Sequence, residues 1–486
     1  MALNEKTKSD IQGSSFIVNV TDIYFTTDTV PKKFWYIDIG DTSSFDDGVN
    51  VLVNIATNVR FKFLKQDYVN AKWFDVVGDG ITNDTNAIQV AVDFVLKYKM
   101  GELIFPAGTY IIYHTIEIKI NSFVTDGSIT IKGIGKKSTI FQGITANSKI
   151  FNTFSYYGLN EPIGTSILHP LTITPDTWPI FHVQADPDLN SYVSFEHLSI
   201  RGSNFIEKGW YTINEEEPKI NYLWLDQGFH ELTCLKLELT AIFYLEDVEI
   251  INSKICVHTI GALVFNINNF VIGGAYGGSS SYKGILTEMG TFIDAIDTNY
   301  IYSNAITLTN GRITYCKNKG IDFGQGVLLN LRSLDIEANG SLMLDNLGNQ
   351  VADPDTGAVF IRNDVNLEGG RISQININEC WFESNYGYTF YTKPVQDNIL
   401  NFYGCNFATK YPDYKSLGIS LDLAGISFIG VKKVNIFGCV NHDSLKPFFI
   451  NANEIVIIGS SLANLGGVYV PTIPVLTESG QFRFMS

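Results

Sequence analysis

The amino-acid sequence predicts an all-β protein that winds as a parallel β-helix. Three observations lead to this prediction. The composition is rich in residues that favour strands and turns, and an eight-residue pattern recurs along the chain. Several copies of that pattern lie roughly 20 residues apart, which is about one coil of a solenoid.

Composition and charge narrow the class of protein. The 486 residues include 34 Lys and Arg against 50 Asp and Glu, which gives a net charge of −16. Nucleic-acid binders need a concentrated positive field, so we expect no nucleic-acid partner. The hydrophobic share of 45% is enough for a large core and excludes a disordered chain.

The hydropathy of the chain predicts no targeting to a membrane. Residues 1–16 contain no basic segment followed by an apolar run, so we expect no secretory signal peptide. No apolar stretch approaches the roughly 20 residues that cross a bilayer, so we also expect no membrane insertion.

The six cysteines occur singly, without a C-x-x-C pair. This spacing argues against a disulfide framework and structural zinc, so we predict free, mostly buried thiols and neither a metal nor another cofactor. Cys380, Cys405 and Cys439 occupy the same position of the repeat, where a small side chain can stack on its neighbour inside a coil.

The repeat reads apolar-x-apolar-x-x-small-x-apolar, where x is any residue. We identify copies that begin at Leu198, Val248, Phe265, Leu308, Leu329, Ile375, Leu400, Val434 and Ile455. Each copy holds two alternating runs that are out of phase by one residue, and a straight strand would turn one run away from the core. A bend between the runs keeps both facing one core.

Glycine, which a tight corner with positive φ favours, often occupies the bend. It occurs there at Gly202, Gly404, Gly438 and Gly459, and by analogy at Gly133. A corner that recurs about every 20 residues and is followed by another strand is typical of a parallel β-helix, whose coils stack at ~4.8 Å. A propeller needs longer periods of roughly 40–50 residues.

The segment Trp73–Ile112 contains a recognisable set of motifs. It has Gly-Asp-Gly at 78–80, Asn-Asp-Thr at 83–85, an amphipathic helix that reaches about Tyr98, and Phe-Pro-Ala-Gly-Thr-Tyr at 105–110. These motifs resemble the opening segment of the pectate-lyase-like superfamily, which includes many phage tailspikes and bacterial polysaccharide enzymes. One departure is Asp-Val-Val just before the first motif, where the family commonly has Phe-Gly-Ala.

The resemblance implies a division of the chain. Residues 71–465 would form a right-handed, single-stranded parallel β-helix, with the family motif and a capping helix at 71–113. Residues 1–70 would be a small β segment that attaches a tailspike to the virion through a phage tail or baseplate adaptor. Residues 466–486 would form a C-terminal cap or oligomerisation tail.

The resemblance also implies an assembly and a location. Phage tailspikes of this class are homotrimers of side-by-side β-helices, so the expected partners are further copies of the chain and a bacterial surface polysaccharide. The expected location is the virion tail, after synthesis in the host cytoplasm without a signal peptide.

Taken by themselves, the residues of the opening segment predict a structural role. Asn83 or Asp84 can cap the helix, whose apolar residues Ile88, Val92 and Val95 lie on one stripe. Such a helix can cover the open end of the first coil. We therefore expect the acidic residues here to serve turns and caps.

Three carboxylates form the predicted catalytic site. The seventh position of the repeat and the residue after the eighth should point outward, and on this face carboxylates occur at Asp335, Glu337 and Glu383. Like charges in proximity raise one pKa and leave a proton available for a general acid. This grouping therefore favours cleavage of a glycosidic bond.

The spacing of the carboxylates depends on the interval between the copies at Leu329 and Ile375, which is either one coil with a long loop or two short coils. In one coil, Glu337 and Glu383 would stack ~5 Å apart, the separation in a retaining glycosidase. Asp335 and Glu383 would then lie ~8 Å apart, within the inverting range.

Five further residues are candidates for substrate binding. Trp381, Tyr386 and Tyr388 offer flat faces on which sugar rings can stack. Arg332 and Arg371 are the nearby cations.

A structural interpretation of the same segments stays open. Ile-Glu-x-Asn and Phe-Glu-x-Asn can form a turn in which Asn339 and Asn385 stack and bond the backbone. Glu337 and Glu383 would then be solvated or paired with arginines.

Three functions fit this fold and site, because the fold alone does not decide among them. The first is a phage tailspike that binds bacterial capsule or O-antigen and hydrolyses it with two of the carboxylates. The second is a polysaccharide lyase, which needs a base and often a cation beside a sugar acid, and which a net charge of −16 does not favour. The third is a non-catalytic virion adhesin.

Overall fold

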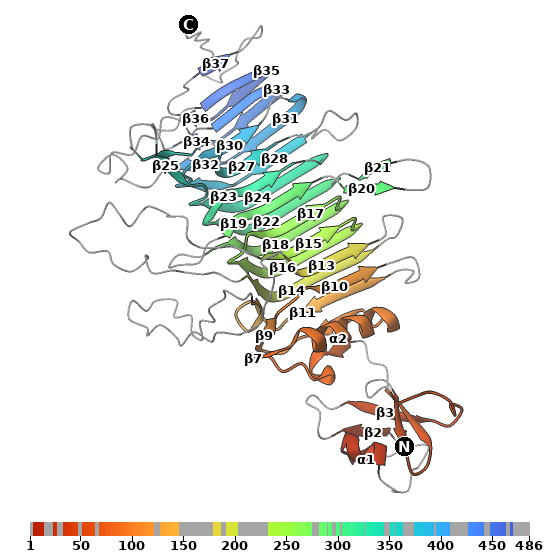
Figure 1. The fold of residues 1–486 in the computed structure, drawn as a ribbon. Helices are drawn as coiled ribbons and strands as arrows, with labels where there is room; N and C mark the ends of the chain where they lie inside the picture. Colours follow the sequence, from red (N-terminus) through yellow and green to blue (C-terminus); the bar gives the residue numbers. More distant parts are fainter. Residues whose placement is uncertain are drawn as a thin grey trace, which may run out of the picture.

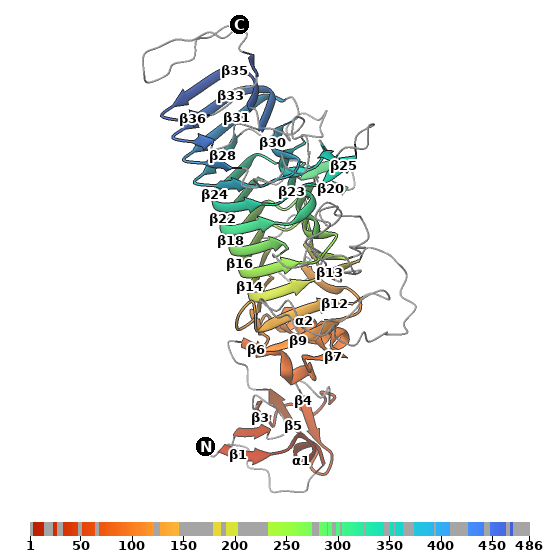
Figure 2. The ribbon, with the colours of Figure 1, turned by 90° about the vertical axis from the view of Figure 1, so that its left-hand side faces the viewer.

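The computed structural model is a long stack of β-coils with a small β unit at its N-terminal end (Figures 1 and 2). Parallel pairing from coil to coil joins 28 strands into one continuous sheet. The prediction of a parallel β-helix is therefore confirmed. The structure describes residues 3–13, 23–26, 33–46, 51–63, 68–120, 127–144, 178–185, 191–202, 232–274, 281–288, 290–293, 298–301, 304–324, 326–344, 350–353, 355–362, 374–392, 395–408, 426–441, 448–462 and 467–469.

The N-terminal unit is a five-stranded sheet with the order β1-β2-β3-β5-β4 and one short helix. Its elements are β1 (Leu3–Lys6), α1 (Lys8–Gly13), β2 (Ile23–Thr26), β3 (Phe34–Asp38), β4 (Val51–Asn54) and β5 (Val59–Phe63). The antiparallel β4–β5 pair belongs to the small β segment expected from the sequence. Tyr24, Trp35 and Phe61 form the buried centre of the unit.

The first coil begins slightly earlier than the predicted boundary at residue 70. Strand β6 (Tyr68–Asn70) pairs in parallel with β8 (Glu102–Ile104), so it already belongs to the β-helix. The 3-10 helix η1 (Ala71–Phe74) and helix α2 (Thr85–Tyr98) follow. Helix α2 packs on β8 and its neighbours at the end of the stack, as the sequence predicts for a cap (Figure 1).

The acidic residues of the opening segment have the structural roles expected of them. Asp84 is the N-cap residue of α2, but its buried carboxylate accepts hydrogen bonds from the backbone of Val77 and Gly78 at 2.6 and 2.9 Å. Asn83 instead bonds the first helical N–H, at Thr85, over 3.0 Å. Burial raises the pKa of Asp84, although the two backbone N–H groups oppose this shift.

Each coil has three walls, which follow one another along the chain. The first wall contains β6, β8, β11 (Ser128–Lys132), the first halves of β14 (Tyr192–Arg201), β16 (Ile242–Ile251), β18 (Val264–Gly273), β22 (Ala305–Thr314) and β24 (Leu328–Glu337), then β28 (Gln374–Asn378), β31 (Val395–Tyr403) and the second halves of β33 (Ile426–Phe437) and β35 (Phe448–Ile458).

The second wall carries the candidate site. It contains β7 (Asp79–Asn83), β9 (Gly108–Ile112), β12 (Thr139–Gly143), the second halves of β14, β16, β18, β22 and β24, then β29 (Trp381–Glu383), β32 (Asn406–Ala408), β34 (Val440–Asn441) and β36 (Ser461–Leu462).

The third wall closes each coil. It contains β10 (Ile116–Ile120), β13 (Pro179–Ala185), β15 (Thr233–Glu238), β17 (Ile255–Ile260), β19 (Ser281–Glu288), β23 (Cys316–Phe323), β27 (Gly357–Ile361), β30 (Tyr388–Thr392), the first halves of β33 and β35, and β37 (Gly467–Tyr469). Two hairpins project from the coils, β20 (Gly290–Ile293) with β21 (Thr298–Ile301) and β25 (Leu342–Leu344) with β26 (Gln350–Ala352). The predicted tail at 466–486 thus begins with a β-helix strand, and residues 470–486 lie outside the described residues.

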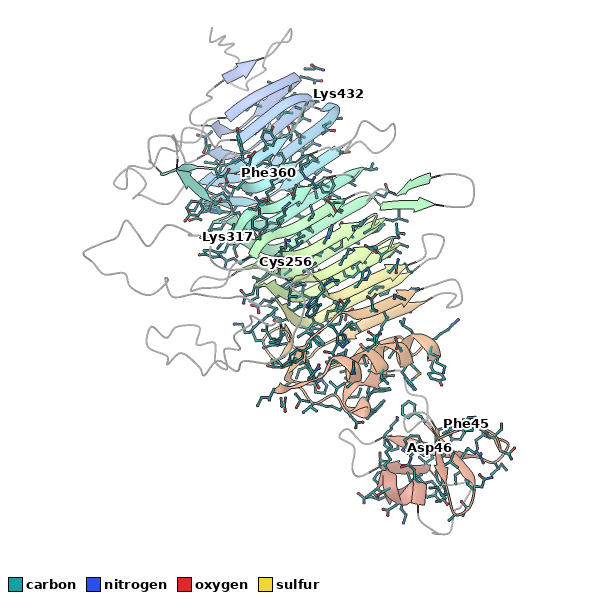
Figure 3. The ribbon with its side chains drawn as sticks, in the orientation of Figure 1. Phe45, Asp46, Cys256, Lys317, Phe360 and Lys432 are labelled. Atoms are coloured by element: carbon teal, nitrogen blue, oxygen red, sulfur yellow. The ribbon has the colours of Figure 1, made fainter. Side chains whose placement is uncertain are left out.

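Stacked side chains fill the interior between the walls (Figure 3). Phe181, Phe195, Phe243 and Phe265 follow one another at centroid distances of 5.1, 6.0 and 5.6 Å. All six cysteines are free and buried, as predicted. The Cys405 N–H reaches the Cys439 sulfur at 3.4 Å, which confirms that the cysteines of this repeat position stack.

The pairing register confirms the predicted repeat frame for six copies and corrects it for three. The copies at Phe265, Leu329, Ile375, Leu400, Val434 and Ile455 stack in register, with Ile306 between the first two. The copies at Leu198 and Val248 are wrong by five residues, because Val248 pairs with Phe270, the sixth position of the next copy. The copy at Leu308 is wrong by two, because Leu308 pairs with Leu331. Alternating apolar residues occur on both arms of the bend, so a short pattern fits more than one frame.

From β14 onward, the bend between the first and second walls is a single residue with positive φ in each coil. Gly404, Gly438 and Gly459 have φ of 59–61°, as expected from the sequence. Gly202 and Gly133 were wrongly assigned to this role, because their φ is not in the left-handed region and they instead make room for neighbouring backbone. In the other coils the bend carries a side chain, and we call these residues the corner column: His197, Asp247, Asn269, Asn310, Ser333 and Glu379, with φ of 50–55°.

Candidate active site on the second wall

The three predicted catalytic carboxylates lie together on the second wall. Strand β24 pairs in parallel with β29, which places Asp335 opposite Trp381 and Glu337 opposite Glu383. Leu329 likewise pairs with Ile375, so the interval that the sequence left open is one coil with an inserted hairpin. Opposite residues on adjacent strands stack at ~4.8 Å along the axis of the β-helix.

Arg312 is a candidate site residue that the sequence interpretation missed. Its Nε donates to Asp335 Oδ2 at 2.9 Å, and its Nη2 donates to Glu337 Oε2 at 3.0 Å. The misplaced frame at Leu308 put Thr314 and Cys316 on the outward face of this coil. In the correct frame, which begins at Ile306, Arg312 occupies the seventh position, directly beside Asp335.

The environment of Glu337 favours its protonated form. Partial burial raises the pKa of Glu337, and the charges of Asp335 and Glu383 add to the effect, while Arg312 opposes it. The Glu337 side chain is 24% exposed, whereas that of Arg312 is 53% exposed. A half-buried carboxyl with a raised pKa beside a solvent-facing cation can hold a proton for transfer.

A side chain of the same strand, that of Trp381, holds the Glu383 carboxylate. The indole Nε1 of Trp381 donates to Glu383 Oε2 at 2.6 Å, so the two side chains lie side by side on the outer face. Both side chains are half-buried. Trp381 thus lies within the predicted cluster, and part of its role is to position the carboxylate.

A buried asparagine pair anchors the two glutamates at the bend that follows the second wall. Ala338 and Ser384 occupy that bend with φ of 55° and 56°. The next residues are buried: Asn339 Nδ2 donates to Asn385 Oδ1 at 3.1 Å, and Asn385 Nδ2 donates to the carbonyl of Ile336 at 2.9 Å. The structural interpretation of these asparagines is therefore correct. It coexists with the outward position of the glutamates, which alternate with buried residues.

The other predicted substrate-binding residues are not gathered at the carboxylates. Tyr386 is only 7% exposed, so its ring is not available to stack on a sugar, and that prediction is wrong. Tyr388 lies on the third wall in contact with the rings of Phe360 and Tyr391.

The structure does not place either of the two predicted arginines beside the carboxylates. Arg332 is exposed on the first wall, and the bend at Ser333 separates it from Asp335. Arg312 therefore takes the place that the sequence interpretation gave to Arg332. Arg371 lies outside the described residues.

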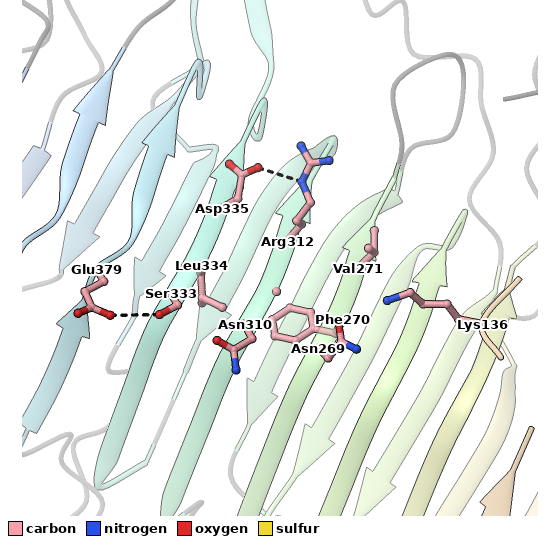
Figure 4. A pocket seen from close by; sticks show the side chains of 11 residues that line it. Lys136, Asn269, Phe270, Val271, Asn310, Arg312, Ser333, Leu334, Asp335 and Glu379 are labelled. Carbon is pink, nitrogen blue, oxygen red and sulfur yellow. Dashed lines mark hydrogen bonds and ion pairs between the residues drawn. The ribbon is translucent and has the colours of Figure 1, made fainter. Parts of the chain in front are cut away.

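A groove of about 520 Å³ runs along the outside of the bend beside the carboxylates (Figure 4). It shares Arg312 and Asp335 with the cluster of carboxylates and extends over the coils that precede them. Its lining residues are Lys136, Asn269, Phe270, Val271, Asn310, Gly311, Arg312, Ser333, Leu334, Asp335 and Glu379. The groove therefore has a mixed polar and apolar surface that leads to the carboxylates.

The described part of the chain shows no group of three or more His, Cys, Asp or Glu side chains with the arrangement of a metal site. Among the same residues, no helix has both the length and the apolar character needed to cross a membrane. Around Glu337 and Glu383 the second wall offers the side chains of Asp335 and Arg312, and a groove lies beside them.

Comparison with known proteins supports the fold. Residues 68–165 match the family model for rhamnogalacturonase A/epimerase, pectate lyase-like. The fold is a parallel β-helix, and its opening coils are similar to this family. A search of curated proteins found no match.

Solved structures include a similar β-helix. The gp42 tailspike of Acinetobacter phage vb_AbaP_AS12 has 12% sequence identity and a TM-score of 0.52, over 99% of this chain and 76% of the tailspike. The enzymatically active domain of tailspike protein 2 from bacteriophage CBA120 has 10% identity and a TM-score of 0.48, over 98% of this chain and 56% of that domain. WceF of Pantoea stewartii, a glycan biofilm modifying enzyme, has 11% identity and a TM-score of 0.42, over 100% of this chain and 54% of that enzyme. The chain thus spans only about half the length of some of its structural neighbours.

Proposed function

We propose that the protein is a phage tailspike that binds a bacterial surface polysaccharide, capsule or O-antigen, and hydrolyses its glycosidic bonds. The observation that carries the proposal is the direct opposition of Glu337 and Glu383 on adjacent strands, beside a groove. A β-helix with this groove and these carboxylates has the parts that endo-acting hydrolysis of a long polymer requires.

The environments of the carboxylates support separate roles for them. Glu337 has a raised pKa and serves as the general acid that protonates the leaving oxygen. Glu383, one coil away and held by the Trp381 indole, serves as the nucleophile. A separation near the ~5 Å coil spacing corresponds to the retaining mechanism, in which a glycosyl-enzyme intermediate forms and water then releases it.

Arg312 and Asp335 complete the proposed site. Arg312 binds both Asp335 and Glu337, so it holds the two side chains in one orientation. Asp335 lies diagonally across from Glu383 and is the residue that would act as a base if the reaction inverted the anomeric carbon.

The proposed biological setting follows the tailspike resemblance. The chain would assemble as a homotrimer, and its N-terminal β unit would attach to the phage tail or baseplate adaptor. The fold of the Acinetobacter phage tailspike, which extends over nearly the whole of this chain, supports that setting.

The test is incubation of the purified protein with a panel of isolated capsular and O-antigen polysaccharides. New reducing ends in a shortened polymer are the expected result. An unsaturated uronate in the product would indicate a lyase, and binding without shortening would leave a non-catalytic adhesin. The Glu454→Gln variant is a matched control, because Glu454 pairs with Lys433 on the first wall, far along the stack from the groove.

A further inference from the structure

The corner column differs from the bends of the three coils that follow it, and four of its residues border or lie in the groove. At Asn269, Asn310, Ser333 and Glu379, residues with side chains adopt φ of 50–55°, a conformation that costs about 1 kcal/mol or more for residues other than glycine. The next three coils have glycine at this position. At Gly404 and Gly438 an added Cβ would meet nothing closer than 3.9 Å, so packing does not require glycine there.

The side chains of Asn269, Asn310, Ser333 and Glu379 lie on the outside of the bend and are only partly engaged with their neighbours (Figure 4). Asn269 Nδ2 donates to Asp247 Oδ1 at 2.9 Å, and Asn310 Nδ2 donates to Asn268 Oδ1 at 2.9 Å. Ser333 Oγ donates to Glu379 Oε2 at 3.3 Å. Within the described residues, the side-chain carbonyls of Asn269 and Asn310 have no donor, and both side chains are exposed to solvent.

The charges of the groove are balanced rather than positive. Its lining holds two cations and two carboxylates. Lys136 is bonded to Asp247 at 3.0 Å, and Arg312 is bonded to Asp335 and Glu337. A polyanionic ligand would therefore meet cations that already have carboxylate partners, in a chain whose net charge is −16.

We propose that the corner column is a row of subsites for a neutral polysaccharide that lies along the axis of the β-helix. The proposal rests on the proposed function and names its substrate class and orientation. Successive coils are ~4.8 Å apart, and a sugar residue in an extended chain advances by a similar length, so each coil presents one polar side chain to one sugar. Asn269, Asn310 and Ser333 bond hydroxyl or acetamido groups, and the chain reaches the carboxylates at Arg312 and Asp335.

Glycine substitutions test the proposal without a folding penalty, because glycine adopts positive φ more easily than asparagine. The double variant Asn269→Gly/Asn310→Gly removes two side chains from the groove. Asn58→Gly is the matched control, since Asn58 has φ of 58° in the hairpin between β4 and β5 of the N-terminal unit. Unchanged melting temperatures in both variants establish that the fold is intact.

Binding is measured by calorimetry with purified neutral and acidic O-antigen and capsular polysaccharides, and with polygalacturonate and dextran sulfate as anionic probes. All variants carry Glu337→Gln so that hydrolysis does not interfere. We expect binding to a neutral polysaccharide, with at least a tenfold loss of affinity in the double variant and no loss in the control.

Two results would overturn the proposal: equal affinity of the double variant and the control, or binding confined to acidic polysaccharides. These outcomes are distinct from a failure of the proposed function. A protein with an intact Glu337 that binds a neutral polysaccharide through Asn269 and Asn310 but never shortens it would refute hydrolysis and leave the row of subsites in place.

Discussion

Glu337 and Glu383 lie directly opposite one another on adjacent parallel strands, although an inserted hairpin and most of a coil separate them in the chain. Each precedes a bend with positive φ, and each is followed two residues later by a buried asparagine. This repeated local structure gives both carboxylates the same direction. The solenoid thus brings together two side chains that no local motif connects.

Removal of either glutamate should abolish hydrolysis. Glu337→Gln and Glu383→Gln are each expected to lower kcat by roughly 10²–10⁴, because each removes a proton donor or a nucleophile while its shape is kept. Reducing-end release from the polysaccharide that the unaltered protein shortens is the measurement. Circular dichroism of both variants should match that of the Glu454→Gln control, and near-normal turnover in both would refute the assignment.

The pH dependence should report the raised pKa of Glu337. A general acid acts in its protonated form, so kcat/KM should fall as pH rises through this pKa, and the raised value extends activity to higher pH. Arg312 lowers the pKa of Glu337, so Arg312→Gln should shift the alkaline limb upward. A limb that stays in place, or moves to lower pH, would show that Glu337 is not the acid.

The asparagine pair should matter for stability. Asn339→Ala removes the acceptor of the buried Cys316 N–H and the donor to the Ile313 carbonyl, which should cost about 1–3 kcal/mol. Urea unfolding checks this value. Asn376→Ala is the comparison, because Asn376 belongs to a half-buried outer row, bonded to Asn330 at 2.8 Å, and should cost less. Equal losses would contradict the assignment of Asn339 to the interior anchor.

Histidine 182 should make stability depend on pH. His182 lies between Glu117 and Glu238 at 3.0 and 3.1 Å, and its pKa is raised chiefly by the hydrogen bond to Glu238. The stabilisation is therefore complete below the ordinary pKa of histidine and is lost as pH rises through the raised value. The same pair lowers the pKa of Glu238 to about 2, so stability is also lost as pH falls from the ordinary glutamate range toward that value.

The variant His182→Gln should flatten the pH dependence of the urea midpoint above neutral pH. The exposed residue His114 provides the control, and His114→Gln should leave that dependence unchanged. A His182 variant with the full pH dependence would show that another group is responsible.

The Gly-Asp-Gly motif should be intolerant of a side chain. Gly78 has φ of 64°, and a Cβ there would lie 2.4 Å from the ring of Tyr110. Gly101 has φ of 80°, with nothing within 4 Å of the same position. Gly101→Ala should therefore cost only about 1–2 kcal/mol for its backbone conformation. Gly78→Ala should cost clearly more in thermal unfolding, and equal costs would show that the contact with Tyr110 is unimportant.

The sequence predicted the coil, the cap and the three carboxylates, because each depends on short-range periodicity or on a local motif. The stacked cysteines and the pair at Asn339 and Asn385 were also accessible, since small or polar residues recur at one repeat position. Arg312 was missed because an alternating apolar pattern fits several frames, and only pairing between coils fixes which one applies.

The groove and the burial of single aromatic residues could not be predicted. Tyr386 follows a bend whose direction decides whether its ring faces solvent or the interior, and the sequence does not specify that direction. The sequence predicted that glycine often occupies the bend, because positive φ favours glycine. Only the backbone angles of the structure show that residues with side chains, such as Asn310, occupy that bend.

The most direct test of the account is the anomeric configuration of the first product, followed by proton NMR while the protein shortens its polysaccharide. A glutamate pair at the spacing of one coil predicts that the new reducing end first appears with the configuration of the original linkage. An inverted reducing end, or an unsaturated sugar in its place, would contradict the assignment of Glu337 as acid and Glu383 as nucleophile.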